Sequence, residues 1–192
     1  PYDALLDEYS PGLTTPDIDA IFKALTRRLP GMIRDALAAQ EGKAALPLSG
    51  RFSGSRQRAL VVEVMKAMGF PFERGRLDES EHPFTEGVPG DIRVTTRFDS
   101  AEPFAGLLGA LHETGHAMYD LGMPPAWRDQ PVGRDRGMAL EESQSLLLEM
   151  IVGRSLAFVR YLQPLLLRHF QVSGPEWEVD TLHRVLTRVR RG

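Results

Sequence analysis

The sequence predicts a mainly α-helical protein with one small antiparallel β element around residues 82–98. Three observations support this fold class. Apolar residues recur at helical spacing over most of the chain, start and stop signals bracket these stretches, and only one segment alternates as a strand does. The chain has 192 residues, of which 42% are hydrophobic and 26% charged. It is therefore long enough to bury the core of a single domain.

The first half of the chain contains three predicted helices. A short helix precedes the turn at Pro11–Gly12, and a second begins at Thr15–Pro16, where a capping residue is followed by proline. We expect Pro30 to kink or break this second helix. A third helix begins at Ser55 and ends at Gly69. We interpret its stripe of valine and methionine as core packing.

One convincing strand covers residues 92–98, because its β-branched residues alternate along the chain. A single short strand needs a partner, and residues 82–87 could supply one as an irregular hairpin. Arg93 and Arg97 fall on the same face of this strand. They are either solvated charges or anion binders, and without other information solvated charges are favoured.

The second half of the chain is predicted to be helical, apart from a long loop at residues 122–137. One helix begins at the cap Ser100 and ends at Gly122, and the next runs from Met138 to about Leu162. We expect Pro164 to break or kink that helix, and a final amphipathic helix to follow residues 173–176. Three glycines interrupt the first of these helices, which must admit close neighbours at those positions: Gly106, Gly109 and Gly115.

Composition excludes several classes of protein. A formal charge of -3 gives no reason to expect a nucleic-acid partner. The sequence has no cysteine, which excludes disulfides and thiolate-bound metals and suits the cytoplasm. It has no apolar run of about 18 residues for a membrane-spanning helix, and its first residues do not read as a signal peptide.

The helix around residue 112 carries the motif H-E-x-x-H. His112 and His116 lie four residues apart and so share a helix face, from which two imidazoles can bind one zinc ion. Glu113 lies beside them and can handle the proton of a metal-activated water. A third ligand is needed, and in the absence of cysteine it must be His, Asp or Glu. The candidates are Glu141, Glu142, Glu149, His169 and His183.

Further motifs, in order, give the chain a resemblance to the M32 (carboxypeptidase Taq) family of metallocarboxypeptidases. His82–Phe84 resembles the family's H-P-F motif, and Asp91–Thr95 its D-x-R-x-T motif. His112–His116 matches its zinc motif, and Glu142–Gln144 the E-S-Q of its H-E-S-Q element. One departure is visible, because Glu141 stands where the family usually has histidine. This departure concerns contacts around the metal or substrate rather than the ligand itself.

The resemblance implies a helical, zincin-like metallopeptidase core over residues 1–192 that removes C-terminal amino acids from peptides. It selects Glu142 as the third ligand of Zn²⁺, for which Co²⁺ or Mn²⁺ could substitute, and Glu113 as the catalytic base. His82, Arg93 and Arg97 are candidate substrate-binding residues. The implied substrates are peptides with a free C-terminus, and a homodimer is the assembly to test.

The family's I-R-x-x-A-D and G-x-x-Q-D-x-H-W motifs are absent from these residues. We therefore expect this chain to be a central fragment of a longer protein, without the family's N-terminal and C-terminal parts. Such a fragment could bind metal and yet cleave poorly. Two alternatives stay open: a metalloendopeptidase with the same ligands, and a non-catalytic helical domain.

Overall fold

The computed structural model describes residues 2–43, 46–88 and 90–189. The first helices and the strands are α1 (Tyr2–Tyr9), α2 (Thr15–Gln40), α3 (Gly54–Ala67), β1 (Gly75–Glu79), β2 (Thr85–Val88) and β3 (Asp91–Thr96). The later helices are α4 (Ala105–Leu121), α5 (Met138–Leu146), α6 (Leu156–Phe170) and α7 (Val179–Leu186). Short 3₁₀ turns cover Pro125–Trp127, Pro131–Gly133 and Pro175–Trp177, and a π-helical segment covers Leu147–Val152. The predicted mainly helical fold class is confirmed.

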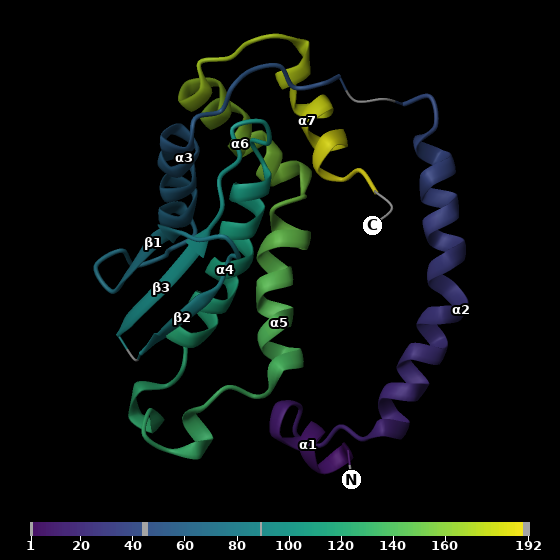
Figure 1. Cartoon of the computed structure of the whole chain (residues 1–192), viewed down its shortest axis with the longest axis vertical. Helices are drawn as coiled ribbons and strands as arrows, with labels where there is room; N and C mark the ends of the chain where they lie inside the picture. Colours follow the sequence, from purple (N-terminus) through teal and green to yellow (C-terminus); the bar gives the residue numbers. More distant parts are fainter. Residues whose placement is uncertain (1, 44–45, 89, 190–192) are drawn as a thin grey trace.

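The three strands form one small sheet in the order β1-β3-β2, with α4 beside it (Figure 1). β2 pairs antiparallel with β3, as the predicted hairpin requires, but β1 pairs parallel with β3. The predicted antiparallel element around residues 82–98 is therefore present, but the prediction missed β1, which adds a parallel strand to it. The sequence Gly-Arg-Leu-Asp-Glu of β1 has low strand propensity, and of its residues only Leu77 is buried. Pairing with β3 creates this strand.

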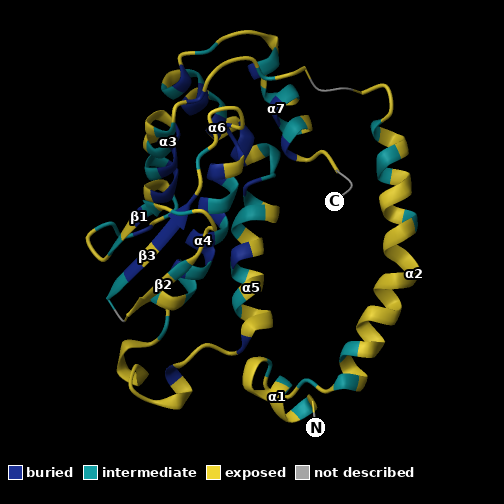
Figure 2. Ribbon diagram, viewed as in Figure 1, coloured by how far each residue is buried: buried dark blue, intermediate teal, exposed yellow. Residues whose placement is uncertain are grey.

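The core lies between the sheet and helices α3, α4, α6 and α7 (Figure 2). The valine and methionine stripe of α3 is buried, which confirms its interpretation as core packing. Phe52, from the loop before α3, stacks edge-on against Phe170 and Trp177, with ring centroids 5.0 and 5.7 Å away. These contacts join the start of α3 to the end of α6 and to the segment before α7.

Helix α2 has no buried residue, although its apolar residues follow helical spacing. It stands apart from the sheet and the core helices (Figure 1). The helix runs unbroken from Thr15 through Pro30 to Gln40, so the predicted break does not occur. Proline removes one backbone hydrogen bond, and its ring crowds the carbonyl of residue i−4, but the turns on either side of Pro30 stay helical. No described helix is both long and apolar enough to cross a membrane.

The predicted single helix from Met138 to about Leu162 is interrupted. It consists of α5, the π-helical segment and α6, with the interruption at Gly153–Ser155. Ser155 caps α6 and accepts a hydrogen bond from the backbone N–H of Phe158 at 3.1 Å. Pro164 lies inside α6 and does not break it. The predicted helix is thus interrupted at Gly153 and the Ser155 cap, and not at Pro164.

Two predicted helix starts are displaced along the sequence. α4 begins after Phe104 rather than Ser100, because a turn is inserted in which Asp99 accepts a hydrogen bond from the N–H of Ala101. Ser53 rather than Ser55 occupies the N-cap position of α3, without a capping hydrogen bond from its side chain. The other end of α4 agrees with the prediction, because Gly122 follows its last turn.

Candidate metal centre

Helix α4 carries both histidines of the motif and is held in place by packing rather than by propensity. Leu107, Ala110 and Leu111 are buried on one side of it. His112 and His116 project from the neighbouring face, where their side chains are 24% and 14% exposed. The imidazoles are therefore sheltered by the fold but still reachable, as ligands of a catalytic metal must be.

Gly115 allows helix α5 to approach α4 closely. A Cβ atom at this position would lie 2.5 Å from the backbone oxygen of Gln144 and 2.5 Å from the Cα of Ser145. Gly106 makes a similar approach to the backbone of Arg97 at the end of the sheet. The expectation that these glycines admit close neighbours is confirmed. The contact at Gly115 brings Glu142, on α5, to the two histidines of α4.

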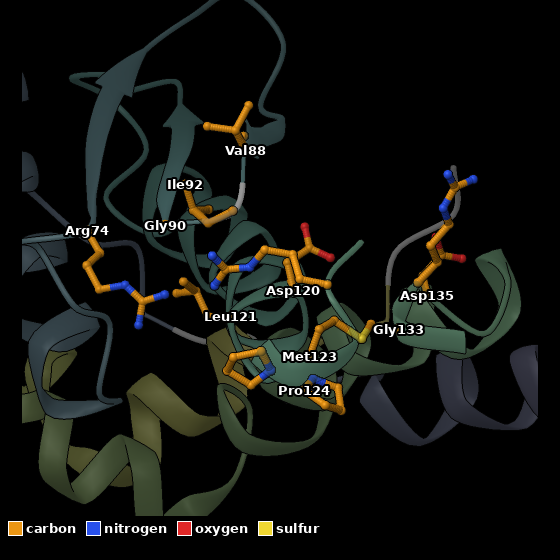
Figure 3. Close-up of a pocket in the computed structure, with 14 residues that line it drawn as sticks. Arg74, Val88, Gly90, Ile92, Asp120, Leu121, Met123, Pro124, Gly133 and Asp135 are labelled. Carbon is orange, nitrogen blue, oxygen red and sulfur yellow. The ribbon is translucent and has the colours of Figure 1, made fainter. Parts of the chain in front are cut away.

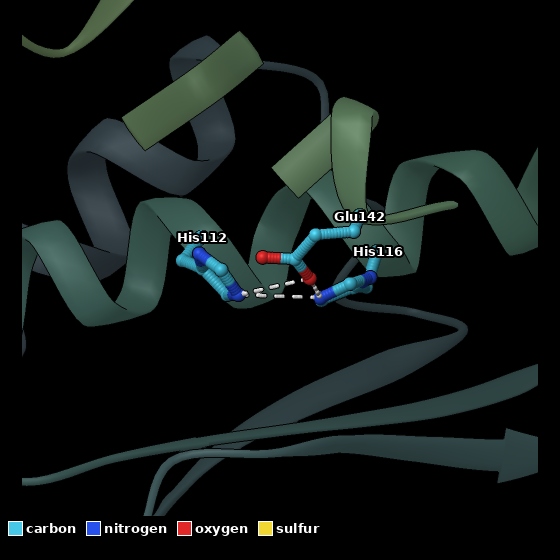
Figure 4. A group of neighbouring side chains, drawn as sticks. All are labelled: His112, His116 and Glu142. Carbon is cyan, nitrogen blue, oxygen red and sulfur yellow. Dashed lines mark hydrogen bonds and ion pairs between the residues drawn. The ribbon is translucent and has the colours of Figure 1, made fainter. Parts of the chain in front are cut away.

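Three side chains converge at this helix contact (Figure 4). His112 Nε2 and His116 Nε2 are 3.3 Å apart, and Glu142 Oε2 lies 3.8 and 3.5 Å from them. Two ligands of a tetrahedral zinc ion, each bound at about 2.0–2.1 Å, are separated by about 3.3–3.4 Å. The three atoms therefore fit one zinc ion after a small contraction. Within the described ranges, no other group of three such residues could hold a metal ion.

His112 is supported from behind by a second carboxylate. Its Nδ1 atom lies 3.1 Å from Glu149 Oε2, and the other oxygen of Glu149 accepts a hydrogen bond of 3.0 Å from Arg154. Arg154 also donates to the backbone oxygen of Leu186 at 2.9 Å, which ties the arrangement to α7. Glu149 belongs to the π-helical segment, which changes the register of the side chains after α5. It is therefore a partner of His112 rather than the third ligand.

His116 also faces a carboxylate on the side away from the ligand triangle. Glu141 Oε1 lies 2.7 Å from His116 Nδ1. The distance suits an ion pair, but the angle is too poor for a hydrogen bond. The buried Nδ1 atom therefore has no hydrogen-bond partner among the described residues. We treat the contact as electrostatic.

Glu113 points to the sheet rather than into solvent and is only 6% exposed. The hydroxyl of Thr85, on β2, lies 2.8 Å from Glu113 Oε2 and 2.8 Å from the Glu113 backbone oxygen. A hydroxyl has one proton, which it directs to one of these acceptors or shares between them. Thr85 therefore fixes one carboxylate oxygen of Glu113 and leaves the other available for proton transfer.

A cavity of about 430 Å³ opens beyond the end of α4 that carries His116 (Figure 3). Asp120, one turn after His116, lines it, and burial raises the pKa of Asp120, with the charge of Glu141 as a second cause. Three guanidinium groups also line this cavity, those of Arg74, Arg128 and Arg134. None of the candidate metal ligands lines this cavity, and no sequence motif indicated it.

The other predicted site residues lie elsewhere. Arg93 pairs with Asp91 at 2.8 Å and Arg97 with Glu81 at 2.9 Å, all on exposed parts of the sheet and its neighbouring loop. His82 is exposed, in the turn before β2. Of these three residues none contacts the described metal triad, and their role in substrate binding stays a prediction.

The two histidines that were candidate ligands are also separate from the metal centre. His169 Nε2 lies 2.7 Å from Glu63 Oε2, across the contact between α6 and α3. His183 lies in α7. Neither belongs to the group of residues that could hold a metal ion.

Sequence reasoning missed Thr85 and Arg154. Thr85 follows the His82–Phe84 motif by one residue, and Arg154 follows Gly153, but neither position has a spacing relation to H-E-x-x-H. Only the sheet pairing and the π-helical segment bring them to the metal centre. The predicted hairpin of residues 82–87 was the one available signal, because it placed this segment beside the strand next to α4.

Comparison with known proteins agrees with the site geometry. The family described as "Carboxypeptidase Taq (M32) metallopeptidase" matches residues 1–192. The chain belongs to the M32 family. The resemblance inferred from the ordered motifs is thereby confirmed.

Individual M32 relatives cover most of this chain. Thermostable carboxypeptidase 1 of Thermus thermophilus is 38% identical over 158 residues, which are 82% of this chain and 31% of the relative. The protein of the same name from Pyrococcus furiosus is 36% identical over 171 residues, which are 86% of this chain and 34% of the relative. The chain thus spans about a third of the length of the curated relatives it matches.

A solved structure agrees over the whole chain. Metallocarboxypeptidase 1 of Trypanosoma cruzi superposes with a TM-score of 0.95 at 38% identity, and covers 100% of this chain and 38% of its own. The M32 carboxypeptidase of Deinococcus radiodurans gives a TM-score of 0.87 at 31% identity, over 97% of this chain and 37% of its own. The arrangement of helices and sheet described above is therefore the M32 arrangement.

Proposed function

We propose that this chain forms the metal centre of a zinc-dependent carboxypeptidase that removes C-terminal amino acids from peptides. The observation that carries this proposal is the triangle of His112 Nε2, His116 Nε2 and Glu142 Oε2, with sides of 3.3, 3.5 and 3.8 Å. Two imidazoles and one carboxylate are a donor set of catalytic zinc sites, and they leave a coordination position open. Co²⁺ and Mn²⁺ accept similar donors and are the substitutes to test.

A zinc ion bound here would polarise the scissile carbonyl and make water a stronger nucleophile at neutral pH. Glu113 would take a proton from the attacking water and later pass it to the leaving amine. Thr85 supports this role because its hydroxyl reaches Glu113 Oε2 at 2.8 Å and restrains the carboxylate.

Recognition of the free C-terminus requires a cation or several hydrogen-bond donors near the metal. Arg93 and Arg97 already pair with Asp91 and Glu81 on exposed surface. The resemblance assigns this task instead to the arginine of the I-R-x-x-A-D motif, which these 192 residues do not contain. We therefore expect weak exopeptidase activity from these residues alone. A homodimer and a cytoplasmic location stay predictions.

Activity with matched peptides tests the proposal. An N-blocked dipeptide with a free carboxylate and the same dipeptide as its C-terminal amide are incubated with the zinc-loaded chain and with a longer version of the protein that contains the I-R-x-x-A-D motif. We expect the longer protein to hydrolyse only the free acid, with loss of activity in a chelator and recovery on adding zinc. Equal cleavage of both peptides would instead support a metalloendopeptidase.

Zinc stoichiometry separates the third alternative, a non-catalytic helical domain. We expect about one zinc ion per chain, in keeping with the single group of three candidate ligands among the described residues. If the chain bound no zinc and a chelator left its peptidase activity unchanged, the non-catalytic alternative would be supported and the proposed function contradicted.

A further inference from the structure

We propose that Glu141 is a positioning residue, which orients His116 for metal binding without being a ligand itself. The proposal rests on the proposed function only in that it assumes a metal at the His112–His116–Glu142 centre. Glu141 Oε1 lies 2.7 Å from His116 Nδ1, while His116 Nε2 faces the other two ligand atoms. The carboxylate therefore contacts the nitrogen that is not available to the metal.

This contact matters because it influences which ring nitrogen of His116 carries the proton. A neutral ring has one protonated and one free nitrogen, and the group that contacts one nitrogen decides which state the other adopts. A carboxylate can only accept a hydrogen bond, so Glu141 favours a proton on Nδ1 and a free electron pair on Nε2. It also raises the basicity of the ligand nitrogen.

Burial strengthens the argument. The Nδ1 atom of His116 is inaccessible to solvent and has no hydrogen-bond partner of good geometry among the described residues. Glu141 is therefore the polar neighbour that this atom has in the folded chain. A small rotation of the ring or of the carboxylate would turn the 2.7 Å contact into a charge-assisted hydrogen bond.

His112 also has a carboxylate at its Nδ1 atom, but a different contact holds that carboxylate in place. Glu149 contacts His112 Nδ1 at 3.1 Å and is itself held by Arg154 at 3.0 Å. Glu141 instead stands in the first turn of α5, one residue before the ligand Glu142. Close packing of α5 on Gly115 sets its position. The carboxylate at position 141 thus replaces, in this chain, the histidine that the resembled H-E-S-Q element carries.

A purely structural role for Glu141 is the competing explanation. A negative charge in the first turn of a helix stabilises the helix through its dipole. That role predicts a less stable fold in a Glu141 variant but no change in the protonation of His116. The two explanations therefore differ in measurements on the metal-free chain.

Zinc affinity is the first measurement, made by competition with a chromogenic chelator. The variants are Glu141→Leu, Glu141→Gln and the control Glu86→Gln, which removes an equal charge from exposed β2. We expect Glu141→Leu to weaken zinc binding about 10–100-fold, as for other partners of metal-bound histidine. Glu141→Gln keeps an acceptor oxygen and should weaken it less, and Glu86→Gln should bind as the unmodified chain does. Equal affinity of all four proteins would overturn the proposal.

The tautomer of His116 is the second measurement, and it needs no metal. Long-range ¹H–¹⁵N spectra of the metal-free chain, at a pH where the ring is neutral, distinguish Nδ1–H from Nε2–H. We expect Nδ1–H in the unmodified chain and in Glu86→Gln, and a shift toward Nε2–H in Glu141→Leu. An unchanged tautomer with a lower melting temperature would assign Glu141 to the helix dipole instead. If the unmodified chain bound no zinc, the proposed function would fail while this spectrum still decided the role of Glu141.

Discussion

At the scale of single residues, the side chains of the candidate metal centre fall into groups by position. His112, His116 and Glu142 direct one atom each to a common point, and the carboxylates of Glu141 and Glu149 lie behind the histidines. Glu113 stands apart from this set, buried against the sheet. A substitution in each group should therefore change a different measured property of the protein.

Glu113→Gln should abolish peptidase activity in the longer protein while zinc binding is retained. The amide has nearly the shape of the carboxylate but cannot take the proton of the attacking water, which costs a factor of about 10²–10⁴ or more in rate. Steady-state kinetics and zinc content are measured on the same preparation. Unchanged turnover would remove Glu113 from the mechanism.

Thr85→Val should lower kcat by about tenfold or more, with little change in KM. Valine has the shape of threonine but loses the hydrogen bond to Glu113 Oε2, and hydrogen bonds to charged groups contribute about 1.5–3 kcal/mol. The matched control is Thr85→Ser, which keeps the hydroxyl and should retain most of the activity. If valine and serine variants lost activity equally, packing of the methyl group rather than the hydrogen bond would be responsible.

At the scale of secondary-structure elements, the centre depends on how closely α5 approaches α4. Gly115 makes this approach possible, because any side chain there would collide with the backbone at Gln144 and Ser145. The π-helical segment then aims Glu149 at His112. Helix packing and helix irregularity together therefore place three carboxylates around two histidines.

Gly115→Ala should destabilise the fold by about 1–3 kcal/mol, as overpacking does, and should also weaken zinc binding. The added methyl group forces α5, and Glu142 with it, away from the histidines. Gly31→Ala on exposed α2 is the control, since its nearest neighbour would be 3.6 Å away and alanine favours helix. Chemical denaturation and chelator competition measure the two effects. A Gly115→Ala protein with normal zinc affinity would show that α5 does not need this close approach.

The contact between α3 and α6 should make stability depend on pH. Hydrogen bonds from Arg168, and then from His169, lower the pKa of Glu63. A carboxyl with a lowered folded-state pKa stabilises the fold at neutral pH, and this contribution is lost as the pH falls through that pKa.

Glu63→Gln should therefore lower the melting temperature at pH 7 but not in acid below that pKa. Because the side chain of Glu63 is 40% exposed, solvent screens the pair and the loss is small, about 0.2–1 kcal/mol or about 1–3 °C. Glu73→Gln, on exposed surface, is the control. A difference between Glu63→Gln and the unmodified chain that persisted in acid would argue against this ion pair.

At the scale of the whole molecule, the metal would link α4, which packs on the sheet, to α5 and the long loop that precedes it. The free energy of metal binding therefore adds to the stability of the folded chain. Helix α2 lies outside this network and has no buried residue, so it should contribute little to the same transition.

Zinc at a free concentration of about 100 times its dissociation constant should stabilise the fold by about 2.7 kcal/mol. For a chain of this size the melting temperature should rise by about 5–10 °C. The effect should weaken in acid, because the histidines must be neutral to bind. Glu142→Ala, which removes one ligand, should abolish most of the shift. An equal shift in that variant would place the bound zinc elsewhere.

The sequence by itself determined the helical class, the core stripe of α3, and the pair His112 and His116 with Glu113 between them. These features are local, because helical spacing alone puts residues four apart on one face. The ordered motifs around them also sufficed to indicate the M32 family, which the family match over residues 1–192 confirms.

Only the tertiary structure separated the three acids Glu141, Glu142 and Glu149 by geometry, and only it revealed Thr85. Their positions depend on helix packing at Gly115, on a π-helical register and on strand pairing across the sheet. The structure also showed that neither Pro30 nor Pro164 breaks its helix, which the sequence left open as a kink or a break. Spacing along the chain encodes contacts within one helix, whereas contacts between elements arise from packing that distant residues set together.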